Sequence, residues 1–199
     1  MKSKYTITII KHALRFVLVF SMFSCSKNET ETEPEPNNFK LTSPAVSNGF
    51  LLDAFKCETK VNGIENSIPL SWSNAPVGTN AFAITMVHYP NPNNLVNYNS
   101  YLVLWGIDKS VTSIAYGKAD DGPWFIGPNK DLNALSYTSP CSPTTSTRRY
   151  TITIFALSST PSSLPTQSSM SVTNQVLMNS LSSVTIIDKA TLVFDSVTP

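Results

Sequence analysis

Apolar and β-branched residues alternate with polar ones in short stretches of the chain from residue 39 onward. Alternation over about four to eight residues is typical of strands that bury one face, and clusters of Asn, Pro, Gly and Ser between the stretches favour turns. The clearest stretches are FKLTS (39–43), FAITMV (82–87), YLVLWGI (101–107), YTITIFAL (150–157) and ATLVF (190–194). In YTITIFAL, the even-numbered residues would share one face and the odd-numbered residues the other. The sequence therefore predicts a mainly β body.

One long helix is expected among the strands. A Ser or Thr cap at 171–173 precedes Val176, Leu177 and Leu181, whose spacing would bury one side of a helix. The β-branched residues of VTII (184–187) favour a return to extended structure.

The charge of the body is small and balanced. The chain has 199 residues, 14% of them charged, and a formal net charge of +1. Residues 39–199 carry nine basic and nine acidic groups, which suits one globular domain and gives no basic surface for nucleic acid. The segments 90–100 and 120–147 are long for loops, so we expect binding surfaces there.

The first residues of the chain have the pattern of an export signal. Four basic residues before position 16 are followed by the apolar run FVLVFSMF (16–23), which is shorter than the roughly 20 residues of a membrane-spanning helix. The run ends at Ser24-Cys25, which resembles the processing site of bacterial lipoproteins. Residues 1–24 are predicted to be a lipoprotein signal peptide, with palmitate or similar acyl chains on Cys25; the alternative is an ordinary secretory signal with an incidental cysteine.

The next segment, SKNETETEPEPNN (26–38), has four glutamates and no apolar residue. It cannot pack a core, and fully extended it would reach up to roughly 40 Å. Its acidic residues resemble surface-export signals of bacterial lipoproteins, and the absence of Asp after Cys25 is compatible with outer-membrane sorting. We therefore expect residues 25–38 to tether the domain in the cell envelope, on either face of the outer membrane.

The stretch SIPLSWSNAPVGTNAFAITMV (67–87) closely resembles the signature of the phosphatidylethanolamine-binding protein family, in its bacterial Raf-kinase-inhibitor-like branch. The resemblance covers residues 39–194 and implies a two-sheet antiparallel β-sandwich with a few short helices. It also implies a small anion-binding pocket at one end of the larger sheet, which in relatives accepts phosphate-like groups. Further matching segments, in the family's order, are LTSPAVSNGF (41–50), YLVLWGI (101–107), SYTSPC (136–141) and RRYTITIFAL (148–157).

The family lines its pocket from three places, and this chain departs from the pattern at each. An Asp-Pro-Asp-x-Pro stretch reads HYPNP (88–92) here, so both aspartates are missing. The histidine that opens the next strand corresponds to Tyr101, or to Ser100 by an alternative count. The Gly-Pro and His-Arg-Tyr motifs read Ser139-Pro140 and RRY (148–150). The resemblance thus implies a ligand-binding set of His88, Tyr101, Pro140, Arg148 and Tyr150.

Two interpretations of this altered pocket remain open. In the first, the pocket has lost its acids, Arg148 holds an oxyanion by two parallel hydrogen bonds, and His88 strengthens binding as the solution becomes more acidic. In the second, the pocket is vestigial, His88 is a solvated turn residue and Arg148 is the exposed flank of a strand.

Two further features lie near the expected pocket: the replacement of a family glycine, and a pair of cysteines. A family glycine upstream of the Tyr-x-Gly-Pro segment corresponds to Asn133, which tolerates a left-handed backbone. Cys57 and Cys141 are an even pair in an exported body, so a disulfide is reasonable. Family members often have cysteines at both positions even in reducing cytoplasm, so two buried thiols are the alternative.

Catalysis is poorly supported by the sequence. Beyond the predicted signal peptide the chain has a single histidine, no GxSxG motif and no His or Cys pair at metal-ligand spacing. We therefore expect a non-enzymatic binding protein, without metal or cofactor, that binds a small anion such as phosphate or a phospholipid headgroup. The alternative is a protein-interaction module, similar to relatives that inhibit proteases or kinases, with a vestigial pocket and a protein partner.

Overall fold

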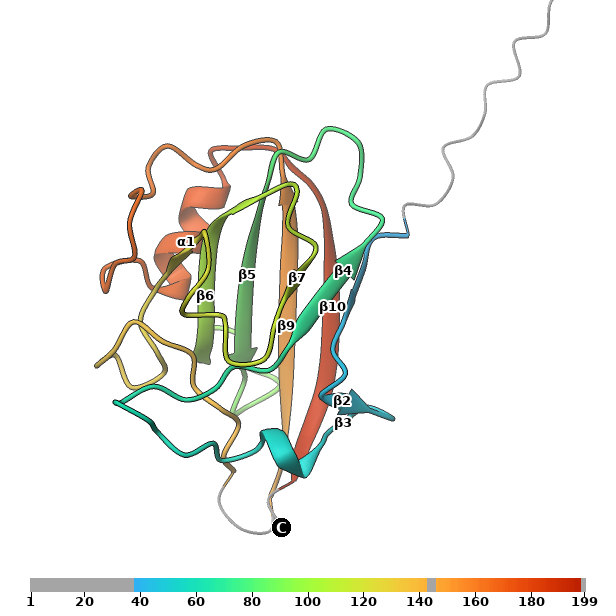
Figure 1. Ribbon diagram of the computed structural model, residues 1–199, viewed down its shortest axis with the longest axis vertical. Helices are drawn as coiled ribbons and strands as arrows, with labels where there is room; N and C mark the ends of the chain where they lie inside the picture. The colour runs from blue at the N-terminus through green and yellow to red at the C-terminus, as the bar shows by residue number, and fades with distance from the viewer. Residues whose placement is uncertain (1–37, 143–145, 198–199) are drawn as a thin grey trace, which may run out of the picture. The chain divides into compact units, whose positions relative to one another are not determined.

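The computed structural model describes residues 38–142 and 146–197 (Figure 1). The predicted signal peptide, the lipidated Cys25 and nearly all of the acidic tether lie outside these residues. Within the described part of the chain, no helix is both long and apolar enough to cross a membrane.

The five predicted strands are present as β1, β5, β6, β9 and β10. The alternation did not reveal β4 or the four two-residue strands, because strands this short do not show a clear alternation of apolar and polar residues. In chain order the elements are β1 (Lys40–Thr42), β2 (Val46–Ser47), β3 (Phe50–Leu51), the 3-10 helix η1 (Asp53–Phe55), β4 (Leu70–Ser73), β5 (Ala81–His88), β6 (Asn99–Asp108), β7 (Ser113–Ile114), β8 (Phe125–Ile126), β9 (Thr147–Leu157), α1 (Asn174–Leu181) and β10 (Ile186–Val197).

The strands form two sheets, and β4 of the smaller sheet crosses in front of the long strands of the larger one (Figure 1). The small sheet has the order β1-β4-β7, and the large sheet has the order β2-β3-β10-β9-β5-β6-β8. The predicted mainly β, two-sheet fold is confirmed. Its pairs are antiparallel except β3 with β10, which pair in parallel at Phe50 and Asp195. A strand as short as β3 gives no sequence signal for the direction of its partner.

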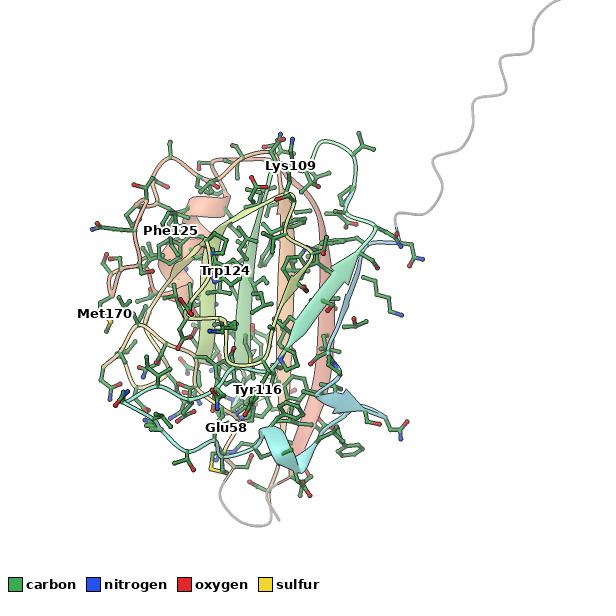
Figure 2. All side chains as sticks on the ribbon, viewed as in Figure 1. Glu58, Lys109, Tyr116, Trp124, Phe125 and Met170 are labelled. Atoms are coloured by element: carbon green, nitrogen blue, oxygen red, sulfur yellow. A yellow bond between two sulfur atoms is a disulfide. The ribbon has the colours of Figure 1, made fainter. Side chains whose placement is uncertain are left out.

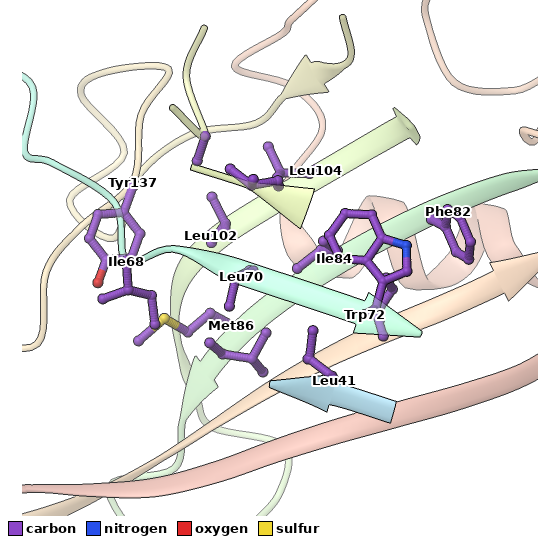
Figure 3. Packing of buried hydrophobic residues seen from close by; sticks show 14 of the residues in the cluster. Leu41, Ile68, Leu70, Trp72, Phe82, Ile84, Met86, Leu102, Leu104 and Tyr137 are labelled. Carbon is purple, nitrogen blue, oxygen red and sulfur yellow. The ribbon is translucent and has the colours of Figure 1, made fainter. Parts of the chain in front are cut away.

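The main core fills the space between the two sheets. Leu70 and Trp72 alternate with exposed residues along β4, so both side chains point toward the large sheet. The Trp72 ring meets Phe82 of β5 edge-on, with 5.6 Å between centroids. Figure 3 shows Trp72 and Leu41 of the small sheet packed over Ile84 of the large one. Burial of these large side chains holds the sheets together.

The alternation along β9 is confirmed. Tyr150, Ile152 and Ile154 are buried in the main core, whereas Thr151 and Thr153 lie half-buried on the other face. The strand pairs with β5 on one side and β10 on the other, so it lies in the interior of the large sheet.

Helix α1 covers part of the outer face of the large sheet. The Thr173 hydroxyl caps it by accepting a hydrogen bond of 3.3 Å from the Val176 amide. Leu177 and Leu181 are buried in a second core together with Phe155. The expected burial of Val176 is wrong, since its side chain is 40% exposed. Leu177 and Leu181 lie four residues apart on one face, and Val176 is turned about 100° away from Leu177.

This difference predicts unequal effects of two neighbouring truncations. Leu177→Ala should lower the free energy of unfolding by about 2–5 kcal/mol, because it leaves a cavity between α1 and the sheet. Val176→Ala should change it by less than about 0.5 kcal/mol. Urea unfolding followed by circular dichroism measures both, and equal losses would contradict the orientation of the helix.

Candidate anion-binding site

Three strand ends meet at one edge of the large sheet. Because β5 runs antiparallel to both β6 and β9, its last residues lie beside the first residues of its two neighbours. In the observed register, His88 is opposite Asn99 of β6 on one side and Tyr150 of β9 on the other. The pairing therefore brings together predicted site residues that are far apart in the sequence.

Tyr150 is the centre of an aromatic cluster at this edge. Its ring lies 5.0 Å from Tyr101, 5.3 Å from His88 and 5.5 Å from Phe194, measured between centroids. All four side chains are buried. The cluster forms a rigid base for the end of the sheet, because aromatic rings in contact have little freedom to reorient.

Arg148 and Tyr101 line a cavity of about 190 Å³ above this cluster. Arg148 lies two residues before Tyr150 and so projects from the same face of β9. Its side chain is half-buried. The cavity walls also include Glu65, Lys130 and Asp131, and its remaining lining residues are Thr138, Ser139 and Cys141.

The tyrosine hydroxyls of the site are protonated at neutral pH. Burial raises the pKa of Tyr101 above its ordinary value, although the neighbouring Tyr150 hydroxyl and the Arg148 guanidinium act in the opposite direction. Burial, with Tyr101 adding to it, also raises the pKa of Tyr150. The Tyr101 hydroxyl at the cavity wall can therefore donate a hydrogen bond to an anion.

The lysines at the cavity lie beside carboxylates, whereas Arg148 does not. Lys130 lies 3.1 Å from Asp131, and Lys60 lies 3.7 Å from Glu65 and 3.9 Å from Asp131, each measured from Nζ to a carboxylate oxygen. No salt bridge to Arg148 is formed by any residue in 38–142 or 146–197. The Arg148 guanidinium is thus the cation of this cavity that an incoming anion can pair with.

A comparison of the sequence with models of known protein families identifies the family of this chain. Residues 42–192 match the family model described as phosphatidylethanolamine-binding protein. The chain belongs to the phosphatidylethanolamine-binding protein family. Members of this family are generally non-enzymatic binding proteins, and the fold is the one expected from the resemblance.

Several solved structures resemble the chain, among them two bacterial proteins. A homologue from Chlamydia trachomatis, described as a putative phosphatidylethanolamine-binding protein homologue, is 22% identical and has a TM-score of 0.65, and the match covers 82% of this chain and 99% of that one. Escherichia coli YbcL, described as a new member of the mammalian family, is 19% identical with a TM-score of 0.65, covering 81% and 99%. No curated protein sequence matches the chain. At these identities the two structures establish the fold alone.

The cavity has acids that the family motif did not predict. The two aspartates of the family's Asp-Pro-Asp-x-Pro stretch are absent, yet Glu65 and Asp131 line the cavity from other segments. The expectation that the pocket has lost its acids is therefore wrong for the cavity as a whole. Neither residue belongs to a recognisable motif, and only the tertiary structure brings them to the strand ends.

Polar bonds and a disulfide hold the segment that carries Glu65 against the cavity. Cys57 and Cys141 are bridged, with 4.5 Å between their Cα atoms. The Cys57 amide donates to the Pro140 carbonyl at 3.1 Å, and the Ser139 amide donates to the Glu65 carboxylate. Pro140 itself is buried behind the wall. It shapes the site through its backbone.

A further contact joins this segment to the loop after β7. The Tyr116 hydroxyl donates a 2.5 Å hydrogen bond to Glu58, and both side chains are labelled in Figure 2. The Glu58 amide in turn donates to the Ser139 hydroxyl at 2.9 Å. Residues from three distant parts of the chain therefore fix one wall of the cavity.

His88 does not line the Arg148 cavity. It is 6% exposed, and its Nδ1 lies 2.9 Å from the Arg149 carbonyl oxygen. Since a carbonyl oxygen only accepts, Nδ1 carries the proton. The interpretation of His88 as a solvated turn residue is wrong. Its ring borders a second cavity of about 300 Å³, which also includes Tyr89 and Arg149.

Arg149 and Asn133, two further positions compared with the family pattern, do not line the cavity. Arg149 projects from the opposite face of β9 and forms a two-bond ion pair with Asp195, at 2.9 and 3.0 Å. The expected left-handed conformation occurs at Leu132, with φ of 56°, and not at Asn133. The Asn133 amide instead donates to the Asn129 side chain at 3.1 Å, which fixes the loop by hydrogen bonds.

No group of three or more His, Cys, Asp or Glu side chains in the described ranges is arranged to hold a metal ion. The chemistry that this site offers is hydrogen bonding and charge pairing. Its donors are the Arg148 guanidinium and the Tyr101 hydroxyl, and its acceptors are the Glu65 and Asp131 carboxylates.

Removal of the disulfide should destabilise the domain. The bridge joins residues 84 positions apart, so the chain-entropy model gives a loss of roughly 4–5 kcal/mol for a Cys57→Ser/Cys141→Ser variant. Urea unfolding measures the loss, and a reducing agent should destabilise the wild type by a similar amount without affecting the variant. Two reactive thiols in a denatured, unreduced Cys25→Ser protein would contradict the bridge.

Asp120 is a partly buried carboxyl near the site that the sequence did not single out. One oxygen accepts a 3.2 Å hydrogen bond from the Tyr137 amide, and the other is buried without a partner in the described chain. Burial raises the pKa of Asp120 from 3.8 to about 6, against the effect of the Tyr137 amide. The folded protein therefore holds this proton more tightly than the unfolded chain does.

Stability should consequently fall as pH rises through this range. The contribution of Asp120 is fully present below about pH 4 and is lost by the time pH exceeds about 6, a decrease of the order of 1–2 kcal/mol after allowance for partial exposure. An Asp120→Asn variant should lack this part of the pH profile in urea unfolding. Asp121→Asn, which changes an adjacent, 78% exposed carboxylate, should retain the wild-type profile.

Proposed function

We propose that this protein is a non-enzymatic binding protein whose Arg148 cavity holds a small anionic group, phosphate-like or part of a phospholipid headgroup. The single observation that carries the proposal is the Arg148 guanidinium, which forms no salt bridge with a described residue and shares a cavity with the protonated Tyr101 hydroxyl. A guanidinium holds two oxygens of a phosphate or carboxylate by parallel hydrogen bonds, and a neutral phenol adds a third donor.

The size of the cavity supports a small group as the occupant. Its volume of about 190 Å³ is below the roughly 300–1,000 Å³ of sites that enclose drug-sized ligands. A phosphate, or the polar end of a larger molecule, is compatible with this space. In a lipid, the acyl chains would remain outside.

The acids of the cavity offer a shared contact to a headgroup that also carries a positive charge. Glu65 and Asp131 offer carboxylate oxygens on the same cavity that holds Arg148. These carboxylates already lie beside Lys60 and Lys130, so the ammonium of a phosphoethanolamine group would share them with the lysines while its phosphate pairs with Arg148.

In this proposal a lipid on Cys25 anchors the domain in the cell envelope, on the outer membrane, and residues 26–38 act as an acidic spacer. The export-signal pattern, the Ser24-Cys25 processing site and the polar composition of the spacer support it. A membrane anchor would keep the binding domain near lipid headgroups. Metabolic labelling with palmitate tests the anchor, and a Cys25→Ala variant should not be labelled.

The test of the binding function uses two adjacent arginines as a matched pair. Arg148→Ala should raise the dissociation constant for inorganic phosphate and for phosphoethanolamine about 10- to 100-fold, because charge-assisted hydrogen bonds contribute about 1.5–3 kcal/mol. Arg149→Ala removes the same charge from the opposite face and should change the dissociation constant less than about twofold. Isothermal titration calorimetry measures both.

Equal affinities in the wild type and the Arg148→Ala variant would contradict the proposal. So would a wild-type protein that binds neither probe. Either result would favour the alternative, a protein-interaction module with a vestigial pocket, whose partner would bind equally to both proteins.

A further inference from the structure

A cavity larger than the Arg148 cavity lies beside it and shares Lys130 with it. It has a volume of about 430 Å³, is open to solvent, and is lined by the loop between β5 and β6, the segment around Asn129 and the first turn of α1. A second cavity, of about 270 Å³, extends over the outer face of the large sheet. Both are lined by Tyr98, Asn174 and Gln175, so they adjoin there. We call this pair of cavities the Tyr98 groove.

The groove contains polar groups that lack protein partners. Asn174 is only 6% exposed and lines both cavities, and its side-chain amide makes no hydrogen bond to the residues that the structure describes. The Ser100 hydroxyl, in the larger cavity, is buried and likewise unpaired within the described chain. Since buried polar groups are ordinarily hydrogen-bonded, the Ser100 hydroxyl indicates a site that a polar ligand completes, and the Asn174 amide, whose atoms are not fully buried, is open to that ligand.

The remaining lining groups are mostly neutral, and the polar ones among them both donate and accept hydrogen bonds. Asn97, Asn99 and Gln175 contribute amides to the larger cavity. Across the outer face of the sheet, Thr85, Thr153 and Thr191 stand side by side in the register of three strands and contribute hydroxyls to the smaller one. The two lysines are the charged residues of the lining, and the Lys130 ammonium is already 3.1 Å from Asp131.

Aromatic rings complete the groove. Tyr98 and Tyr89 are half-buried, and their rings meet edge-on with 6.0 Å between centroids. Tyr98 lines both cavities and Tyr89 the smaller one. A tyrosine ring offers a flat apolar surface of large area together with one hydroxyl.

We infer that the Tyr98 groove is a binding site for a neutral saccharide. Amides pair with neighbouring hydroxyls because each side of the pair donates and accepts, and the aromatic face packs against the C–H face of a sugar ring. The volumes of the two cavities fall near the lower end of the range for small-molecule sites and suit an oligosaccharide of a few rings. This ligand class differs from the anion proposed for the Arg148 cavity.

The test uses the full-length chain and three neutral trisaccharides, maltotriose, cellotriose and triacetylchitotriose, at up to about 10 mM, by saturation-transfer NMR and calorimetry. At least one should bind the wild type. Tyr98→Ala should weaken that binding about tenfold or more and Asn174→Ala about fivefold, whereas Tyr98→Phe should retain it within about threefold. Thermal unfolding of each variant shows whether the fold is kept. If Tyr98→Ala does not fold, the binding result of Asn174→Ala tests the inference in its place.

Two control variants separate this site from the anion site. Tyr116→Ala removes a 45% exposed tyrosine outside the groove, and Arg148→Ala removes the anion-binding cation; neither should affect trisaccharide binding. Conversely, Tyr98→Ala should leave phosphate binding unchanged. The inference is overturned if none of the three trisaccharides binds, or if binding is equal in the wild type and the Asn174→Ala variant.

Discussion

The pairing register of β9 is the constraint on which the rest of the structure depends. This strand lies between β5 and β10, and Tyr150 is directly opposite His88 on one side and Phe194 on the other. Side chains alternate between the two faces of a strand, so a slip of one residue would place Arg149 on the inner face and turn Arg148 and Tyr150 outward. The buried even-numbered residues prevent this slip, because each would lose its place in the core. Core packing and the placement of the Arg148 guanidinium therefore have the same physical cause.

The two ends of the sandwich are closed in different ways. Over the main core, the small sheet covers the large one, and Trp72 packs edge-on against Phe82. At the strand ends that form the Arg148 cavity, the walls come from strand ends and loops, and no residue of β1, β4 or β7 lines it. Here the chain is held by the Cys57–Cys141 bridge and by hydrogen bonds to the backbone of residues 139–140. These directional links replace apolar packing and leave an open, polar site.

The charge pattern of the site follows from which groups are already paired. The lysines near the cavity lie beside Glu65 and Asp131, and Arg149 pairs with Asp195 on the other face. Arg148 is left without a carboxylate in the described chain, although the acids and bases of the body are equal in number. Net charge thus says little about this site, because local pairing decides which charge remains for a ligand. The Tyr98 groove, by contrast, is almost free of charge and offers amides and hydroxyls.

The sequence by itself determined the family, the mainly β class, the five long strands, the capped helix and the residues Tyr101, Arg148 and Tyr150 at the end of the sheet. These features follow from local periodicity, capping and motifs, which are properties of neighbouring residues. Only the tertiary structure decided that Glu65 and Asp131 line the Arg148 cavity, that His88 is buried beside it, and that Asn174 and Tyr98 share a groove. Such contacts join residues tens of positions apart. They depend on strand register and loop paths, which leave no periodic trace in the chain.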